Sequence, residues 1–310
     1  MPVTVITGFL GSGKTTLLQR LLAHPAFGET AVIVNELGEV PIDHHLLRRV
    51  DERTVVLGNG CVCCTLRGDL ADELRDLLGR RERGEVPPFR RVVVETTGVA
   101  DPAPILYTLE SEPVVRHHFE IERVITTVDA VHGLRGEESL LQAAAADRLV
   151  VTKTDLADGR ELAGRLAALN PAAEVLEAQF GELDPGQLFG GDERGPQPAA
   201  PRHEHARHAE GVEAQCLVFD DPLDWTAFGV WLTMLLASRG RDVLRVKGLL
   251  DVGGDGPLLV NGVQHVVHPP VHLPSWPDDD RRSRIVFIGR GLERRSLEQS
   301  LAAFVRAARQ

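Results

Sequence analysis

The chain has 310 residues, of which 43% are apolar and 25% charged, and its formal net charge is −11. This composition is typical of a globular protein with one large or two ordinary domains. The negative charge argues against general binding to nucleic acid or to anionic membranes. No apolar run approaches the roughly 20 residues of a membrane-spanning helix, and a strand predicted from Val3 leaves no room for a signal peptide, so we expect a cytoplasmic protein.

Short β-branched runs alternate with amphipathic stretches from residue 1 to about residue 184. This alternation predicts an α/β domain, with a mostly parallel sheet and helices on both of its faces. The predicted strands are Val3–Thr7, Ala31–Val34, Thr54–Leu57, Arg91–Glu95, Val124–Val128, Leu149–Thr152 and Glu174–Leu176. Predicted helices between them include Thr15–Ala23, Leu66–Leu78, Ser139–Asp147 and Arg160–Leu169.

The composition changes after residue 184. Residues 185–211 are rich in Gly, Pro, Ala and charged residues, and this predicts a flexible linker. Residues 212–310 contain strands and a few helices without regular alternation, which predicts a smaller α+β domain. Its predicted elements are strands at Val212–Phe219, Val243–Leu250, Leu258–Val267 and Arg284–Ile288 and helices at Leu223–Ala237 and Glu293–Ala308.

The segment Gly8–Thr15 matches the phosphate-binding pattern G-x-x-x-x-G-K-[ST], between a predicted strand and a predicted helix. The glycines allow backbone N–H groups to close around phosphate oxygens, and the helix N-terminus attracts negative charge. Lys14 is expected to bridge the β and γ phosphates and Thr15 to offer its hydroxyl to Mg²⁺. The predicted phosphate-contacting residues are Gly11, Ser12, Gly13, Lys14, Thr15 and Thr16.

A second nucleotide motif is expected at the end of the apolar run that leads to Glu95. A carboxylate at this place can hold Mg²⁺, directly or through water, as a Walker B residue does. Gly98 follows three residues later and is predicted to offer a backbone N–H to the γ-phosphate. Lys14, Thr15 and Glu95 are therefore the candidate catalytic residues.

The four residues Thr152–Asp155 follow another apolar run and resemble the guanine-binding motif Asn-Lys-x-Asp. The Asp155 carboxylate can accept hydrogen bonds from two N–H groups on one edge of guanine. The Lys153 stem can cover the face of the ring. Thr152 replaces the usual Asn, so the motif favours GTP over ATP but departs from the commonest form.

Three of the four cysteines lie close together, at Cys61, Cys63 and Cys64, between the two phosphate motifs. In an extended segment Cys61 and Cys63 project to one side, whereas Cys64 points away from Cys63. Two or three thiolates favour Zn²⁺ or Cu⁺, with Co²⁺ below Zn²⁺ in intrinsic affinity. The alternatives are a redox pair or small buried apolar residues.

Two further groups of side chains are candidate metal ligands. Glu36 and Glu39 follow the second predicted strand and can complete either the Mg²⁺ shell or the thiolate site; solvated carboxylates are the alternative. His203, His205 and His208 lie in the predicted linker and can hold a divalent ion weakly, although a solvated tract explains them as well.

These motifs together resemble the CobW family of P-loop GTPases, relatives of the HypB and UreG metallochaperones. The resemblance rests on Gly8–Thr16, Val34–Val40, Gly58–Cys64, Glu95–Pro102, Arg245–Gly248 and Val286–Gly289. The short chain and its Thr-Lys-Thr-Asp variant look most like the YjiA-type subgroup. The resemblance implies a P-loop GTPase domain joined to a CobW C-terminal domain, slow GTP hydrolysis, and binding of Zn²⁺, Co²⁺ or Ni²⁺. It assigns Cys61, Cys63 and Cys64 to the metal, with Glu39 as an acidic neighbour.

Three functions follow as hypotheses. The first is a metallochaperone that uses GTP, GDP and Mg²⁺ to control metal transfer to a client metalloprotein or metal-inserting enzyme. The second is a metal-buffering protein whose nucleotide site is structural, and the third is a P-loop kinase that uses ATP. The sequence identifies neither the metal nor the client, and it is compatible with a homo-oligomer.

Overall fold

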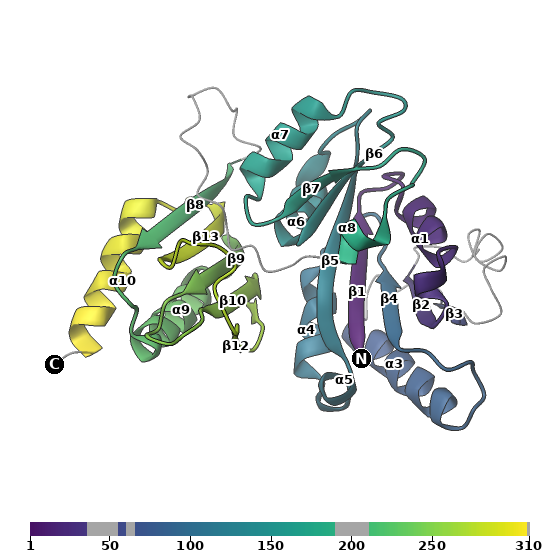
Figure 1. Ribbon diagram of the computed structural model, residues 1–310, viewed down its shortest axis with the longest axis horizontal. Helices are drawn as coiled ribbons and strands as arrows, with labels where there is room; N and C mark the ends of the chain where they lie inside the picture. Colours follow the sequence, from purple (N-terminus) through teal and green to yellow (C-terminus); the bar gives the residue numbers. More distant parts are fainter. Residues whose placement is uncertain (36–54, 60–65, 190–210, 309–310) are drawn as a thin grey trace. The chain divides into compact units, whose positions relative to one another are not determined.

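The computed structural model describes residues 1–35, 55–59, 66–189 and 211–308 (Figure 1). The first part of the chain forms a sheet of seven strands in the order β3-β2-β4-β1-β5-β6-β7. Neighbouring strands from β3 through β6 pair in parallel, which confirms the predicted α/β sheet. The strands are β1 (Pro2–Gly8), β2 (Thr30–Asn35), β3 (Val55–Asn59), β4 (Arg91–Glu95), β5 (Glu120–Asp129), β6 (Arg148–Thr152) and β7 (Glu174–Glu177).

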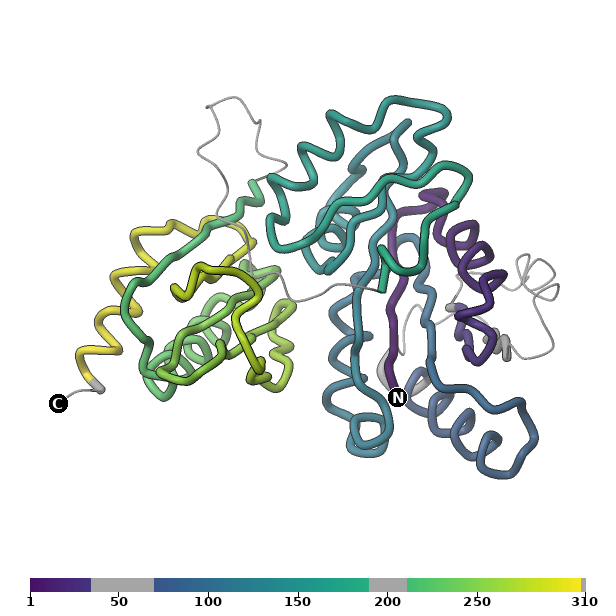
Figure 2. Tube along the Cα trace, in the orientation of Figure 1, coloured from purple at the N-terminus to yellow at the C-terminus, as the bar shows by residue number. Residues whose placement is uncertain are grey.

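Helices cover both faces of this sheet. On one face the apolar side of α1 (Lys14–Leu22) packs on Ile6 and Val32, together with Leu188 of α8 (Pro185–Phe189). On the other face lies α6 (Gly136–Ala145), whose Gln142 carbonyl accepts a hydrogen bond of 2.7 Å from the Thr126 hydroxyl of β5. Figure 2 shows the chain turning back from the end of β1 directly into α1. The remaining elements are η1 (Pro25–Phe27), α3 (Leu66–Glu82), α4 (Ala103–Ser111), α5 (Pro113–His118) and α7 (Arg160–Leu169).

Helices α4 and α5 were not expected from the sequence, because prolines at their starts suggest breaks in structure. Pro104 lies in the first turn of α4 and Pro113 begins α5. In the first turn an amide N–H has no helical partner in any case, so proline fits there. The Asp101 carboxylate also accepts a hydrogen bond from the Ala103 N–H at the start of α4.

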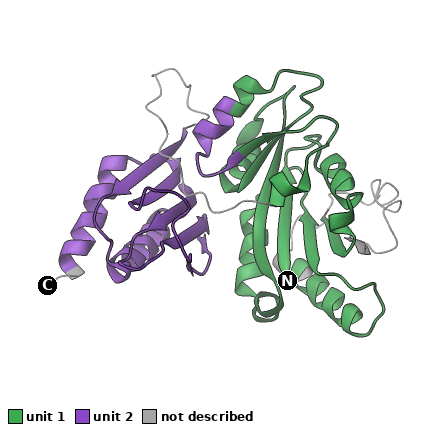
Figure 3. Cartoon of the chain, viewed as in Figure 1, with its two compact units in different colours: residues 1–163, 175–190 green, residues 164–174, 191–310 purple. Residues whose placement is uncertain are grey.

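The start of the predicted linker is ordered. Residues 185–189 form α8, and Leu188 within it is fully buried. The rest of the predicted linker, with His203, His205 and His208, lies outside the described residues, apart from residue 211. The chain divides into two compact units, residues 1–163 with 175–190 and residues 164–174 with 191–310 (Figure 3).

The second unit contains an antiparallel sheet in the order β11-β10-β9-β13-β8, with β12 paired to β10. Trp231 of α9 and Leu301 of α10 share its apolar core, and the Trp231 indole N–H donates to the Ser300 hydroxyl. This is the α+β architecture predicted for residues 212–310. Its elements are β8 (Val212–Phe219), α9 (Trp225–Arg239), β9 (Val243–Leu250), β10 (Leu258–Val263), β11 (Val266–Val267), β12 (Val271–His272), β13 (Ser283–Arg290) and α10 (Arg294–Ala308).

One predicted strand in this unit was wrong. The apolar run Leu258–Val267 forms a hairpin of β10 and β11, in which Gly262 pairs with Val267. The chain reverses at Gln264, whose φ of 51° is in the left-handed region that residues other than glycine seldom adopt. The sequence at this point has no glycine in the turn, so the reversal was not visible. Among the described residues, no helix has the length and apolar character needed to cross a bilayer.

Candidate nucleotide site

The phosphate loop leaves the carboxyl end of β1 and ends where α1 begins, as the sequence predicts. Gly13 precedes the first residue of α1 with a φ of 92°. A side chain at Gly8 would also not fit, because its Cβ would lie 2.4 Å from the Thr127 carbonyl oxygen. The loop therefore needs glycine at both ends, which leaves its backbone N–H groups able to surround a phosphate.

The Lys14 side chain lies inside this loop. Its ammonium group donates to the carbonyl oxygens of Gly8 at 2.8 Å and Phe9 at 3.2 Å, and the residue is only 8% exposed. A flexible four-carbon stem allows the ammonium to exchange these carbonyls for phosphate oxygens. The structure thus places Lys14 at the loop, in contact with its backbone.

Thr15 and Glu95 meet at the mouth of the loop. The Thr15 hydroxyl donates to a Glu95 carboxylate oxygen at 2.6 Å, and Glu95 is 3% exposed. The parallel register that pairs Ile6 of β1 with Glu95 of β4 brings the two together. A hydroxyl and a carboxylate are hard oxygen ligands of the kind Mg²⁺ prefers, so these two side chains fit a Mg²⁺ ion bound with a nucleotide.

Gly98 lies against the phosphate loop. A Cβ at this position would be 2.5 Å from the Leu10 backbone nitrogen and 2.7 Å from the Leu10 Cα. Glycine is therefore required here by the close approach of two backbone segments. The structure brings together the predicted residues Lys14, Thr15, Glu95 and Gly98.

The predicted base motif lies at the end of β6. Thr152 replaces the usual asparagine, and its hydroxyl donates to the carbonyl oxygen of Ser12 at 2.7 Å. This bond joins the base motif to the phosphate loop. Asp155 is exposed, so its carboxylate is accessible to a nucleotide base from solvent.

Asp129, at the end of β5, is a residue that the sequence did not single out. Its carboxylate accepts hydrogen bonds from Lys153 Nζ at 3.2 Å, from the His132 ring and from the His132 backbone N–H. Burial by itself raises the pKa of the Asp129 carboxyl, but these bonds outweigh it and hold the pKa below its usual value. Asp129 thus fixes Lys153, whose φ of 57° is in the left-handed region.

A second segment that the sequence did not single out, residues 178–182, lies on α1. A Cβ at Gly181 would be 2.9 Å from the Thr16 Cγ2, and the Phe180 carbonyl accepts a bond from Arg20. Phe180 itself is 62% exposed. Gly181 is the one residue of this segment that could have indicated the contact from the sequence, because close packing on a helix requires the absence of a side chain.

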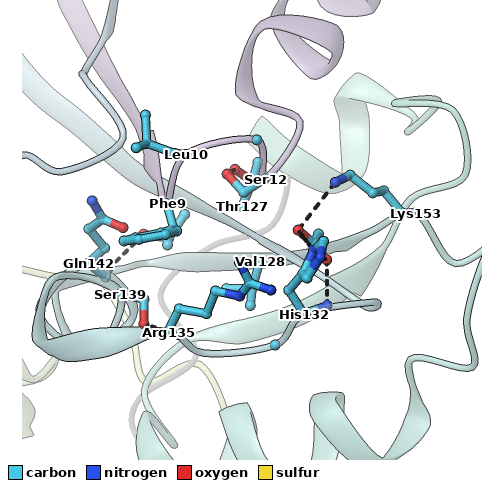
Figure 4. A pocket seen from close by; sticks show the side chains of 14 residues that line it. Phe9, Leu10, Ser12, Thr127, Val128, His132, Arg135, Ser139, Gln142 and Lys153 are labelled. Carbon is cyan, nitrogen blue, oxygen red and sulfur yellow. Dashed lines mark hydrogen bonds and ion pairs between the residues drawn. The ribbon is translucent and has the colours of Figure 1, made fainter. Parts of the chain in front are cut away.

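A pocket opens beside the phosphate loop (Figure 4). Loop residues 9–12 form one wall, and the end of β5 with the following residues forms another. Helix α6 contributes Ser139 and Gln142, and at the other end of the pocket the Lys153 and His132 side chains both bond to the Asp129 carboxylate. The pocket therefore joins the phosphate loop to the base motif.

The predicted metal ligands Cys61, Cys63, Cys64, Glu36 and Glu39 lie outside the described residues. In the part of the chain that is described, no three His, Cys, Asp or Glu side chains form a cluster suited to a metal. The strands that lead to them are described: β2 ends at Asn35 and β3 at Asn59, and these two residues are paired. Both strands thus end at the edge of the sheet where the phosphate loop lies, because carboxyl ends of parallel strands share one edge.

A glycine-rich loop between a parallel strand and a helix, with a buried carboxylate on the neighbouring strand, defines a P-loop nucleotide-binding protein. Residues 2–177 match the CobW/HypB/UreG nucleotide-binding domain, and residues 212–305 match the cobalamin synthesis protein CobW C-terminal domain. The chain belongs to the CobW/HypB/UreG family.

Two named relatives and one solved structure resemble nearly the whole chain. The zinc chaperone YjiA of Escherichia coli is 35% identical over 97% of this chain and 97% of its own length. The zinc chaperone CobW of Pseudomonas aeruginosa is 31% identical over 97% of this chain and 90% of its own. The crystal structure of Zn(II)-bound YjiA GTPase from E. coli superposes with a TM-score of 0.76, covers 98% of both chains, and is 31% identical.

Guanine recognition by Asp155 is testable by one substitution. We expect Asp155→Asn to raise the dissociation constant for GDP by about 10- to 100-fold, because an amide accepts only one of the two guanine N–H groups and turns a donor toward the other. Calorimetric titration with GDP and ADP measures this. Asp158→Asn is the matched control, since Asp158 is exposed and its hydrogen bonds within the described part of the chain are with Arg160. Unchanged GDP binding, or equal binding of ADP, would favour an ATP-using enzyme instead.

Proposed function

We propose that this protein is a GTP-hydrolysing zinc chaperone, in which GTP controls the binding or release of the metal. The observation that carries the nucleotide half is the group of Lys14, Thr15 and Glu95 at the phosphate loop, with the Thr15 hydroxyl 2.6 Å from the Glu95 carboxylate. The zinc half rests on the thiolate motif and on relatives that are named zinc chaperones. Co²⁺ and Ni²⁺ are weaker alternatives as cargo.

In this proposal the residues of the phosphate loop act mainly by binding and orienting the nucleotide phosphates. Lys14 leaves the Gly8 and Phe9 carbonyls and contacts the β and γ phosphates, while Gly11, Ser12, Gly13 and Thr16 complete the phosphate contacts. Thr15 and Glu95, with Glu36 as a further candidate, would hold Mg²⁺, which would supply neutralisation of the charge that develops on the phosphates. The four residues that follow Gly98 include no glutamine to orient a water, so intrinsic hydrolysis should be slow.

The proposed cargo site is formed by Cys61, Cys63 and Cys64, with Glu39 beside them. The described ends of β2 and β3 support this, because both strands end at the phosphate-loop edge, and in sequence Glu36 is one residue after Asn35 and Cys61 two residues after Asn59. In the proposal, binding of a γ-phosphate there changes the spacing of the thiolates. The recipient is a client metalloprotein or metal-inserting enzyme, and the linker histidines remain a prediction as auxiliary ligands.

Zinc affinity measured with GTP analogue or GDP bound tests the whole proposal. We expect the dissociation constants in the two states to differ by at least about fivefold, the lower end of typical coupling between sites. Cys63→Ala should weaken zinc binding by more than the roughly 10- to 100-fold that loss of an outer-shell partner costs. A competition assay with a chromophoric zinc chelator, on the full chain, measures both effects.

Cys216→Ala is the matched control for this experiment. Cys216 lies in β8 of the second unit, and burial raises the pKa of its thiol, which makes it a poor metal ligand. Its removal should leave zinc affinity unchanged. Equal zinc affinity with GTP analogue and GDP would exclude the coupling, and unchanged affinity in Cys63→Ala would exclude the thiolate site.

A further inference from the structure

Gln142 connects α6 to the segment that follows the Walker B strand. Its side-chain N–H₂ group donates to two carbonyl oxygens, that of Gly98 at 3.3 Å and that of Ala100 at 3.0 Å. Both amide hydrogens are therefore used on residues two apart in the same segment. The side chain is completely buried, so water does not compete for these bonds.

The other end of this amide is unsatisfied. Among the described residues, Gln142 Oε1 is buried and accepts no hydrogen bond. An unmet buried acceptor is unfavourable, and an apolar residue of similar size would avoid it. Flipping the amide would place this oxygen against two carbonyl oxygens, so the observed orientation is set by the two bonds to Gly98 and Ala100.

The segment that Gln142 holds is in direct contact with the phosphate loop. A Cβ at Gly98 would be 2.5 Å from the Leu10 nitrogen, so the two backbone segments are in close contact. A shift of Gly98 therefore changes its position relative to the phosphate loop. Gln142 itself lines the same pocket as Leu10 and Ser12 of the loop (Figure 4). The helix that carries it is fixed to the sheet by the bond from Thr126 to the Gln142 carbonyl.

We propose that Gln142 is a positioning residue for the γ-phosphate. Its hydrogen bonds to the Gly98 and Ala100 carbonyl oxygens fix the position of this segment relative to the phosphate loop. Gln142 itself does not contact the nucleotide in this proposal. The inference rests on the proposed GTP-dependent function. It predicts that substitution of Gln142 weakens binding of GTP more than binding of GDP. Loss of a purely structural amide would weaken binding of both nucleotides alike.

The test compares Gln142→Met with the wild type on the full chain. Methionine fills a similar volume and removes both donors together with the unsatisfied acceptor. We expect the affinity for a non-hydrolysable GTP analogue and single-turnover GTP hydrolysis each to fall by about tenfold, as the loss of one to two hydrogen bonds implies. GDP affinity should stay within about twofold, because GDP has no γ-phosphate to contact the segment.

Two further variants make the result decisive. Gln142→Asn keeps the amide but is shorter by one methylene, so it should show the same selective loss and decides the question if the methionine variant does not fold. Leu141→Met is the control for general disturbance of α6, since Leu141 is the neighbouring residue of that helix, is half-buried and does not line the pocket, and the change conserves volume. It should behave like the wild type.

The outcomes separate this inference from the proposed function. If the wild type hydrolyses GTP and the Gln142 variants keep the wild-type ratio of GTP-analogue to GDP affinity, or lose both affinities equally, the role of Gln142 is wrong and the proposed function stands. If the wild type itself neither hydrolyses GTP nor distinguishes the analogue from GDP, the proposed function fails and this inference fails with it.

Discussion

Replacing Lys14 with alanine should reduce single-turnover GTP hydrolysis by about 10²- to 10³-fold, the usual cost of removing one charge-stabilising donor from a transition state. The ammonium already lies within the phosphate loop, bonded to the Gly8 and Phe9 carbonyls. No other lysine belongs to this loop, because the chain has only Lys14, Lys153 and Lys247. Rapid-quench measurement of phosphate release with enzyme in excess over GTP gives the rate directly.

Lys247→Ala is the matched control for this experiment. Lys247 lies in β9 of the second unit, so its removal makes the same chemical change outside the phosphate loop. Melting temperatures of both variants show whether folding is intact. Hydrolysis by Lys14→Ala within about threefold of the wild type would contradict the assigned role of Lys14 and favour a nucleotide site that serves only to stabilise the fold.

The sequence predicted most of the fold because its α/β unit is built from local patterns. β4 and α7 have the predicted bounds, and so do β8 and β9 in the second unit. The errors occurred where a local signal was weak or misleading. Prolines concealed α4 and α5, and a turn at Gln264, without glycine, concealed the β10–β11 hairpin.

In the candidate site, sequence patterns predict residues that belong to motifs but not residues that act through distant partners. Lys14, Thr15, Glu95 and Gly98 are predicted from the sequence because each belongs to a motif of fixed spacing, and the structure places them around one loop. Asp129 and Gln142 act through partners far away in sequence, 24 residues to Lys153 and 44 to Gly98, and no spacing rule connects them. Such contacts follow from strand order, which sequence patterns do not define.

Thr152 is an instructive departure from the usual motif. In the sequence, threonine in place of asparagine is a departure from the commonest form of the base motif. In the structure its hydroxyl reaches the Ser12 carbonyl, and a Cβ at Gly13 would be 3.5 Å from that hydroxyl. Threonine thus provides a donor from β6 to the phosphate loop, and this hydrogen bond links the base motif to the loop, while Lys153 of the same motif is bonded to Asp129.

Replacing Gly98 with alanine should be about as damaging as removing Lys14, although it adds only one carbon. The new Cβ would overlap the Leu10 backbone nitrogen at 2.5 Å and the Leu10 Cα at 2.7 Å, so either the loop or the Gly98 segment must move. We expect a loss of folding stability of about 1–3 kcal/mol, typical of overpacking, and GTP hydrolysis lower by about 10²-fold, as misplacement of about an ångström costs.

Gly164→Ala separates this steric effect from the general effect of the substitution. Gly164 lies inside α7, where an added Cβ would meet nothing within 4 Å, so alanine there should stabilise the protein by about 0.5–1 kcal/mol. Denaturant unfolding and single-turnover hydrolysis measure both variants. Gly98 belongs to the segment whose carbonyl oxygens Gln142 binds. The effects of Gly98→Ala and Gln142→Met on hydrolysis should therefore combine less than additively. Full additivity, or wild-type hydrolysis by Gly98→Ala, would show that the position of this segment does not control the reaction.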